Sequence, residues 1–358
     1  MTMHTIAEIS EATGLAMVGD GSVRVQRPCP PDQAGVDDLA VAMSERFADR
    51  LADCPAVAAV LWKGANLDDF GLQAALLAPR PRVAMAAMTE LFSFSEDLEP
   101  GIHPMANVAA DAVLGVDAWV GPFAQIGPRA RIGAGARIAG QVTIGADAQI
   151  GARTILRAGS RIGARCVLGE NVLVHENAVI GADGFSFEPP QKGSVEAARE
   201  TGAVSASNTQ GFLRIHSLAA VTVGDGVEIG ACTTLDRGTL ADTRIGSGTK
   251  IDNQVQIGHN VQVGENCLLC AQVGIAGSAT IGDRVVLGGK VGVGDHLKIG
   301  SDVICAAATM VAGNIPPQSI MMGVPAIPRD KMMRQVMALR RLPRVMDQVN
   351  EIRTKLGL

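Results

Sequence analysis

A branched aliphatic residue returns every six positions over most of this chain, and no other feature constrains the fold as strongly. The first run starts at Ile102 and ends at Ile180. Between these ends it takes in Val108, Leu114, Val120, Ile126, Ile132, Ile138, Ile144, Ile150, Leu156, Ile162, Leu168 and Val174. A second run starts at Val223, slips by four residues after Leu235 and continues to Ile299.

A six-residue period fits neither an α-helix nor a simple half-buried strand. It predicts a parallel β-helix, a prism in which three short strands form one coil of about 18 residues and the repeated aliphatic residues point inward. Successive coils should lie about 4.8 Å apart, the spacing of hydrogen-bonded strands. Glycine follows many of the aliphatic residues, and we expect it to take the unusual backbone angles of the corners. The composition agrees, because only 3% of the residues are aromatic, tyrosine is absent and 42 residues are glycine.

The repeat divides the chain into three parts. Residues 1–100 lack it, and their mixed apolar stretches predict a small α/β domain with helices over 5–13 and 69–77. Residues 101–315 form the predicted prism, and a polar, Pro-Pro-containing stretch at 181–222 predicts a loop that leaves it. So long a loop is either a harmless insertion or a segment that closes a site. Residues 316–358 predict a helical tail that Pro343 divides into two helices.

The composition excludes several classes of protein. A net charge of −5 provides no general basic field, so nucleic acid is not an expected partner. Seven cysteines, an odd number, argue against a disulfide framework and favour a reducing compartment. No run of 18 apolar residues predicts a transmembrane segment, and the first residues lack the pattern of a signal peptide. We therefore expect a cytoplasmic protein.

The tail carries charge of the opposite sign. From Arg329 onward eight basic residues stand against three acidic ones, a net charge of +5 that leaves −10 for the rest of the chain. Basic residues on a helix are often no more than a solvated face. The alternative is a docking surface for an acidic partner, where charge steers the encounter.

Histidine is the natural general base near neutral pH, and His259 has the most unusual surroundings of the six histidines. It belongs to the segment 251–260, which places five polar side chains within half a coil. One coil further on is Gly277, whose N–H we expect close enough to the imidazole for a base and an oxyanion donor to share one carbonyl. His296 lies two coils and one residue beyond His259 and could line the same groove. The alternative is that a lone histidine on a β-helix only decorates its surface.

The sequence predicts no metal site. Cys267 and Cys270 form a single CxxC pair, Cys267 occupies the small-residue position before Leu269, and no second pair matches. Packing is therefore favoured over zinc binding.

The hexad pattern resembles the left-handed β-helix of hexapeptide-repeat acyltransferases. Three segments, 181–185, 229–238 and 251–260, resemble more specifically the UDP-3-O-acylglucosamine N-acyltransferases of lipid A biosynthesis, and the order of α/β domain, prism and helical tail agrees along the whole chain. The resemblance implies an enzyme that moves a 3-hydroxyacyl chain from acyl carrier protein to the 2-amino group of the nucleotide sugar. It implies no cofactor beyond the phosphopantetheine arm of the carrier. It also implies a homotrimer with its sites in grooves between neighbouring prisms.

The resemblance assigns roles to individual residues. His259 would be the general base, Gly277 would donate to the oxyanion, and Asp252 would orient the base or hold the amine. The other predicted substrate contacts are Asn253, Gln256, His296 and, at the end of an apolar groove for the acyl chain, Met310. The residues predicted to bind the acidic carrier are Arg334, Arg340, Arg341 and Arg344.

The first domain departs from the family pattern. The family stacks an aromatic ring on uracil with an asparagine close by, whereas Val41 and Ser44 stand at these positions here and only Phe47 keeps ring character. The segment 214–217, Arg-Ile-His-Ser, replaces a Lys-Ile-Pro-Gln run.

Three alternatives follow: an N-acyltransferase for a different amino or nucleotide sugar, an acetyl-CoA-dependent sugar acetyltransferase, and a non-catalytic scaffold. Long-chain transfer predicts an apolar channel beside Gly277 and Met310, acetyl transfer needs only a small pocket, and a scaffold would lack a groove that pairs His259 with Gly277.

Overall fold

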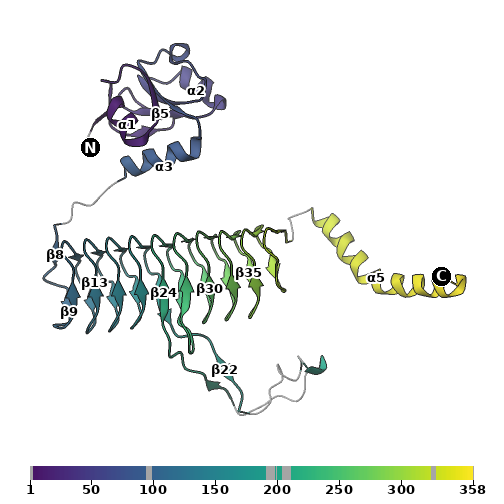
Figure 1. Ribbon diagram of the computed structural model, residues 1–358. Helices are drawn as coiled ribbons and strands as arrows, with labels where there is room; N and C mark the ends of the chain where they lie inside the picture. Colours follow the sequence, from purple (N-terminus) through teal and green to yellow (C-terminus); the bar gives the residue numbers. More distant parts are fainter. Residues whose placement is uncertain are drawn as a thin grey trace. The chain divides into compact units, whose positions relative to one another are not determined.

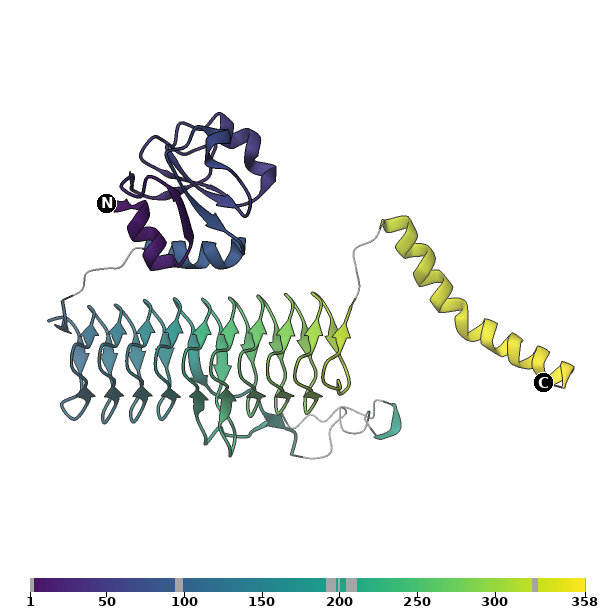
Figure 2. The same ribbon diagram turned by 45° about the horizontal axis from the view of Figure 1, so that its top comes forward.

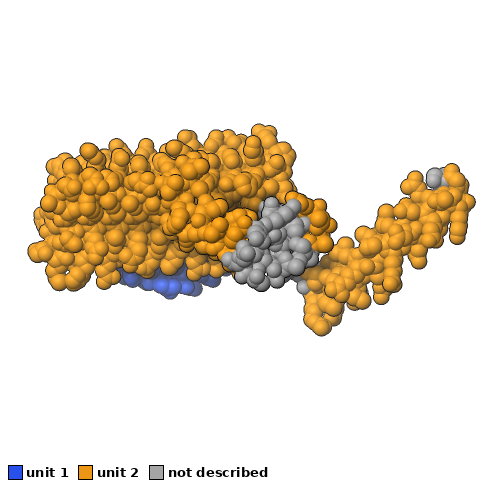
Figure 3. Space-filling model, turned by 90° about the horizontal axis from the view of Figure 1, so that it is seen from below, with its two compact units in different colours: residues 1–97 blue, residues 98–358 orange. Residues whose placement is uncertain are grey.

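The computed structural model describes residues 3–93, 99–190, 198, 200–203, 211–323 and 328–357. The chain forms two compact units, Met1–Asp97 and Leu98–Leu358, which Figure 3 colours separately. The division falls close to residue 100, where the six-residue repeat begins.

The first unit is an α/β domain built on a sheet of order β2-β7-β6-β5-β4, in which β2 runs antiparallel to β7 and the other pairs are parallel. The strands of the unit are β1 (His4–Thr5), β2 (Ala16–Gly19), β3 (Arg24–Val25), β4 (Pro28–Cys29), β5 (Leu39–Ala42), β6 (Ala58–Trp62) and β7 (Ala74–Ala78). The helices are α1 (Ile6–Thr13), α2 (Ala48–Ala52), α3 (Pro81–Leu91) and the 3₁₀ turns η1 (Glu45–Phe47) and η2 (Leu67–Phe70). The α/β prediction is confirmed.

The two helices predicted for this domain have different outcomes. The helix over 5–13 is α1, which begins with a capping box: the Thr5 hydroxyl accepts from the Glu8 N–H at 3.1 Å and the Glu8 carboxylate accepts from the Thr5 N–H at 2.8 Å. The helix over 69–77 is wrong. The short η2 ends at Gly71 in the left-handed conformation (φ 65°), and the chain then forms β7, an inner strand of the sheet between β2 and β6. A strand buried on both faces reads as a continuous apolar run, which periodicity cannot distinguish from a helix.

The second unit contains the predicted parallel β-helix, and in the described residues three parallel sheets form its walls (Figure 1). Sheet 1 contains β8 (Gly101–Ile102), β11 (Trp119–Val120), β14 (Arg137–Ile138), β17 (Ile155–Leu156), β20 (Leu173–Val174), β25 (Glu228–Ile229), β28 (Lys250–Ile251), β31 (Leu268–Leu269), β34 (Val286–Leu287), β37 (Ile304–Cys305) and β39 (Ile320–Met321). Sheet 2 contains β9 (Asn107–Val108), β12 (Gln125–Ile126), β15 (Thr143–Ile144), β18 (Arg161–Ile162), β21 (Val179–Ala182), β26 (Thr234–Asp236), β29 (Gln256–Ile257), β32 (Gly274–Ile275), β35 (Gly292–Val293) and β38 (Met310–Val311). Sheet 3 contains β10 (Val113–Leu114), β13 (Arg131–Ile132), β16 (Gln149–Ile150), β19 (Val167–Leu168), β24 (Val221–Val223), β27 (Thr243–Ile245), β30 (Gln262–Val263), β33 (Thr280–Ile281) and β36 (Lys298–Ile299).

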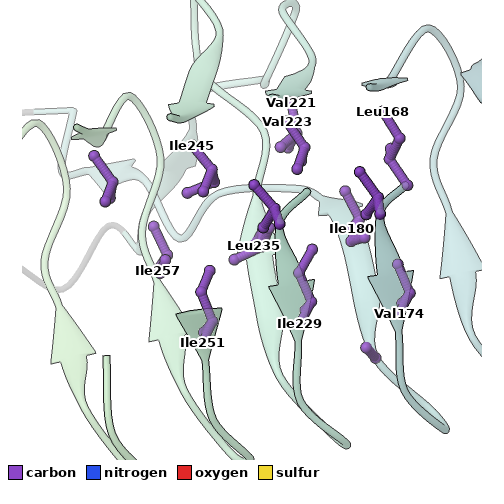
Figure 4. Packing of buried hydrophobic residues seen from close by; sticks show 14 of the residues in the cluster. Leu168, Val174, Ile180, Val221, Val223, Ile229, Leu235, Ile245, Ile251 and Ile257 are labelled. Atoms are coloured by element: carbon purple, nitrogen blue, oxygen red, sulfur yellow. The ribbon is translucent and has the colours of Figure 1, made fainter. Parts of the chain in front are cut away.

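The repeated aliphatic residues form ladders inside the prism, as predicted. In sheet 2 Ile180 pairs with Leu235 and Leu235 with Ile257, and all three side chains are buried (Figure 4). Burying one such side chain contributes about 1.5–3 kcal/mol. The stacked aliphatic residues therefore supply the core of the β-helix without aromatic side chains.

The predicted role of the glycines holds at only some corners. Among the glycines that follow a repeated aliphatic residue, Gly181 has a left-handed angle (φ 91°), but Gly127 and Gly133 do not. At Gly133 a Cβ would lie 2.5 Å from the backbone nitrogen of Ala152 in the next coil, so close approach of coils, rather than φ, requires glycine there. The left-handed corner positions are mostly filled by other residues, among them Gln254 (φ 58°).

The predicted loop leaves the prism after β21 and returns at β24 (Figures 1 and 2). Its two arms pair as the short antiparallel strands β22 (Phe187–Glu188) and β23 (Leu213–Arg214). Arg237, in the coil that follows the exit, anchors the loop: its Nε donates to the Gly181 carbonyl at 2.9 Å and its Nη2 to the Ala164 carbonyl at 3.1 Å.

The tail forms one helix, α5 (Arg329–Leu356), which continues through Pro343, so the predicted division into two helices is wrong. Proline lacks the N–H of one i→i−4 hydrogen bond, and the turns on either side continue without it. None of the helix residues is buried. In the part of the chain that the structure describes, no helix combines the length and the apolar character needed to cross a membrane.

Candidate active site

His259 lies on the edge of the prism where sheet 2 turns into sheet 3, between β29 and β30. We call this row of turns the 2–3 edge. The long insertion leaves the same edge two coils earlier. Gly277 takes the corresponding position in the next coil, and His296 follows β35 one coil further on, where its N–H donates to the Gly277 carbonyl at 3.1 Å.

The imidazole of His259 is held by its neighbour Asn260. Nδ1 lies 3.0 Å from Asn260 Oδ1, which also accepts from the Thr239 N–H at 3.1 Å, while Asn260 Nδ2 donates to the Ala241 carbonyl at 2.9 Å. These two backbone contacts fix the orientation of the amide, so the atom facing the ring is an acceptor. The Nδ1 atom of the neutral ring therefore carries the proton, and the lone pair of Nε2 is free to accept one.

Two glycines enclose the ring. A Cβ on Gly277 would lie 2.8 Å from both Cε1 and Nε2 of His259, and a Cβ on Gly184, from the insertion, would lie 2.7 Å from its Cβ. Any side chain at either position would displace the imidazole. Within the described residues the Gly277 N–H has no hydrogen-bond acceptor, so a backbone donor is available beside Nε2.

A buried acid stands next to this pair. Asp236 ends β26, is 8% exposed, and accepts a hydrogen bond from Gln256 Nε2 at 3.1 Å. Burial raises the pKa of the Asp236 carboxyl, and the Gln256 donor and the nearby His259 imidazole act in the opposite direction.

Asp236, Asn260 and Gly184 were not singled out from the sequence. The slip of four residues hid Asp236, because Thr234 of β26 pairs with Gln256 of β29, a separation of 22 rather than 18 residues. If the separation between these two coils is taken as 22 residues, Asp236 lies beside the turn that carries His259. No spacing could have found Gly184, because it lies in the inserted loop.

A groove runs along the outer face of sheet 2 away from His259. It encloses about 580 Å³, and its floor is the outward row Gln256, Gly274, Gly292 and Met310, paired strand by strand. Nothing lies within 4 Å of the place where a Cβ of Gly274 would be, whereas a Cβ on Gly292 would meet the Met310 sulfur at 2.8 Å. Missing side chains open the groove, and Met310 closes its far end.

The structure does not bring Asp252 and Asn253 to His259 within one chain. They lie on the edge between sheets 1 and 2, where Asp252 accepts from the N–H groups of Asn253 (2.8 Å) and Ala271 (3.0 Å). Seven residues separate Asp252 from His259, which is one strand and its turn, and so places them on neighbouring edges. Within a single chain Asp252 therefore does not orient the base, and Asn260 has that position.

Asp252 and Asn253 line a second groove of about 530 Å³. Its other polar lining includes His175, whose Nε2 lies 2.9 Å from a carboxylate oxygen of Glu228, and Lys250.

The residues predicted to hold uracil lie in the first unit at the end of β5. Val41 packs with the cluster formed by α1 and α3, Phe47 packs with the cluster on the opposite face of the sheet, and Ser44 precedes η1. The Cζ atoms of Arg46 and Arg50 lie 4.8 and 6.0 Å from the centre of the Phe47 ring. The structure therefore does not gather Val41 and Phe47 on one face.

The predicted carrier-binding arginines are all exposed on α5: Arg334, Arg340, Arg341 and Arg344. All seven cysteines are free. Among the described residues no group of histidine, cysteine, aspartate and glutamate could hold a metal ion.

Residues 111–146, 147–182 and 242–277 match the family model described as bacterial transferase hexapeptide (six repeats). A Ruegeria pomeroyi protein named UDP-3-O-acylglucosamine N-acyltransferase is 44% identical over 351 residues, which cover 98% of this chain and 97% of that protein. The chain belongs to the UDP-3-O-acylglucosamine N-acyltransferase family. A member of this family from Granulibacter bethesdensis is 39% identical over 95% of this chain and 94% of its own.

A solved structure shows the same fold. The Arabidopsis UDP-N-acetylglucosamine acyltransferase aligns with a TM-score of 0.53 and 20% identity, over 62% of this chain and 71% of its own. The predicted family and the left-handed parallel β-helix are thus both confirmed for this UDP-3-O-acylglucosamine N-acyltransferase family member.

Proposed function

We propose that this chain moves a 3-hydroxyacyl group from the phosphopantetheine thiol of acyl carrier protein to the 2-amino group of a UDP-3-O-acylglucosamine. The relatives named for this activity match nearly the whole chain. The observation that carries the proposal is the free Nε2 of His259 beside the Gly277 N–H, next to a groove that is lined by Ala276, the residue before Gly277, and by Met310.

The chemistry uses both groups. The sugar nitrogen attacks the thioester carbonyl, a C–N bond forms, and His259 Nε2 takes the proton that the nitrogen loses. The carbonyl oxygen becomes an oxyanion, and the Gly277 N–H donates to it. When the C–S bond breaks, the imidazolium returns its proton to the departing thiolate, which leaves an amide and a free carrier thiol. No further cofactor is required.

The groove supports a long acyl chain. The floor from Gln256 to Met310 spans three strand spacings, about 14 Å, and its lining is largely aliphatic or glycine. An acetyl donor would leave most of this length empty, and a scaffold would have no need of the His259–Gly277 pair on the neighbouring edge. Met310 is placed to limit chain length, and His296, on the same edge, to contact the nucleotide sugar or the carrier arm.

A homotrimer would complete the site. Asp252 and Asn253 lie on the edge between sheets 1 and 2, whereas His259 lies on the 2–3 edge. A substrate that contacts all three residues therefore needs two copies of the chain, with the edge between sheets 1 and 2 of one copy packed against the 2–3 edge of the other. The tail supports self-association, because α5 carries apolar residues seven apart on an exposed stripe, Met332, Leu339 and Met346 with Leu342, Val349 and Leu356. Such a repeat buries itself in a bundle of parallel helices.

The remaining assignments concern partners. The net +5 tail suits an acidic carrier protein, and Arg334, Arg340, Arg341 and Arg344 would steer it. Phe47, with Ser44 and Val41 on the neighbouring segment, would support the uracil. Seven free cysteines suit the reducing cytoplasm, where acyl carrier protein would be met.

The test is a transfer assay with the full chain. Purified protein would be supplied with acyl carrier protein loaded with 3-hydroxyacyl and unsubstituted chains of several lengths, and with a panel of amino sugars that includes UDP-3-O-acylglucosamine. Mass spectrometry should detect an N-acylated nucleotide sugar and free carrier. Transfer only to a different amino sugar would show that UDP-3-O-acylglucosamine is not the acceptor. No transfer from any acyl carrier would overturn the proposal.

A further inference from the structure

Asp236 has no role in the chemistry above, yet it is the buried acid of the 2–3 edge. It belongs to β26, which pairs with β29 so that Leu235 lies opposite Ile257 (Figure 4). The next residues of the two strands, Asp236 and Gly258, are therefore neighbours, and His259 follows directly. An acid placed here acts on the imidazole through space.

The surroundings hold this acid in place rather than neutralise it with a cation. Gln256 Nε2 donates to one carboxylate oxygen at 3.1 Å, and the register of β21 sets Ala182 beside Asp236 on the other side. Arg237, the next residue, directs its guanidinium to the carbonyls of Gly181 and Ala164. The Asp236 carboxylate thus faces an amide donor, and the strand register sets it beside the turn that carries His259.

The other charged groups of this edge have partners of their own. Asp242 accepts from the Ala220 N–H at 2.9 Å and from the Thr222 hydroxyl at 3.0 Å. Asp183, on the insertion, lies 3.7 Å from Arg214. The nearby His259 imidazole acts to lower the pKa of the buried Asp236 carboxyl, against the larger effect of burial.

We propose that Asp236 is a positioning residue whose carboxylate stabilises the imidazolium that His259 becomes when it takes the amine proton. The inference rests on the proposed function of His259 as the base. Asn260 holds Nδ1 and fixes the tautomer, whereas Asp236 supplies the charge that a neutral amide cannot. In a Ser-His-Asp triad one aspartate both fixes the tautomer of the histidine and stabilises its imidazolium. Here Asn260 has the first function and Asp236 has the second.

The test replaces the charge and keeps the shape. In Asp236→Asn the side-chain oxygen still accepts from Gln256, but the negative charge is gone. We expect kcat to fall about tenfold with KM within twofold, and the acidic limb of the kcat/KM profile to move to lower pH. A carboxylate that only braces the turn would lower stability without moving that limb.

The matched control is Asp242→Asn. It is the same substitution on the same edge, but the Asp242 carboxylate accepts hydrogen bonds from Ala220 and Thr222, where the insertion ends. It should leave the acidic limb in place, and thermal unfolding of both variants shows that the fold persists. A second readout needs no activity: the NMR titration midpoint of the His259 Cε1 proton, assigned by its loss in His259→Gln, should shift to lower pH in Asp236→Asn alone. An unchanged midpoint in folded Asp236→Asn overturns the inference. Failure of the proposed function would give a different result. The wild-type protein would then transfer no acyl group, although the NMR titration midpoint of His259 would still differ between the wild type and Asp236→Asn.

Discussion

Asn260 Oδ1 meets His259 Nδ1 at 3.0 Å while it also accepts a hydrogen bond from the Thr239 N–H. The residue after the histidine thus sets both the tautomer and the direction of the ring. The four-residue slip makes this possible, because the lengthened turn 237–242 provides the Thr239 N–H and the Ala241 carbonyl that hold the Asn260 amide.

Removing this side chain should impair the base without breaking the coil. Asn260 has a left-handed backbone (φ 63°), so Asn260→Gly removes the amide and keeps the conformation. We expect kcat to fall by about ten- to a hundredfold, because the ring can then adopt either tautomer and turn away. Asn266→Gly, at an exposed left-handed corner (φ 54°), is the control. Equal activity of the two variants would show that Asn260 does not orient the ring.

A methyl group at residue 277 should be enough to stop transfer. The Cβ of Gly277→Ala would lie 2.8 Å from His259 Nε2, so the imidazole or the donor N–H must move. Loss of an oxyanion donor typically costs about 10²–10³ in kcat, and we expect an effect of this size in steady-state assays. Gly313→Ala is the control, because nothing lies within 4 Å of its added Cβ. Activity of Gly277→Ala within threefold of wild type would mean that the oxyanion is held elsewhere.

Shortening Met310 should change the chain-length preference. Its side chain lies over Gly292 and ends the groove. Met310→Ala extends the open floor, so the ratio of kcat/KM for longer over shorter acyl carriers should rise about tenfold or more. The competition between carriers is read by mass spectrometry. Met322→Ala, at an equally exposed methionine outside the groove, should keep the wild-type ratio. A preference that Met310→Ala leaves unchanged would place the acyl chain on another surface.

Charge reversal on the tail should weaken the use of the carrier in a salt-dependent way. Arg340→Glu with Arg341→Glu lowers the tail charge by four, and we expect KM for acyl carrier protein to rise about tenfold at low salt, with a smaller rise at 0.5 M salt because screening removes the steering. KM for the nucleotide sugar should stay constant. Matched variants at Arg353 and Lys355, beyond the predicted surface, provide the comparison. An unchanged KM for acyl carrier protein at low salt would show that these two arginines do not bind the carrier.

Much of the fold could be predicted because one period fixes it. Each aliphatic residue from Ile102 onward repeats the same inward position, so the strands, the three sheets and the stacking follow from the sequence. The strand β7 could not be predicted in this way, because its burial on both faces removes the alternation that marks a strand. The helix break predicted at Pro343 is wrong for a different reason. Proline removes only one hydrogen bond from this 28-residue helix, and the helix continues across it.

The site could be predicted only where it obeys the 18-residue coil. His259 and Gly277 are one coil apart, and the structure brings them together. Asp236 lies beyond the slip, and Gly184 lies in the insertion, so neither has a spacing that leads to it. Asp252 shares a conspicuous segment with His259, but closeness along a β-helix places residues on successive edges of the prism rather than side by side.

In the proposed mechanism His259 is the proton acceptor, and the rate of amide formation by His259→Ala measures its contribution. The assay measures N-acylated product by mass spectrometry with both substrates saturating, on protein whose thermal unfolding and oligomeric state match the wild type. Loss of a general base predicts a rate lower by about two to four orders of magnitude. A folded His259→Ala that works within a few-fold of the wild-type rate would contradict the mechanism.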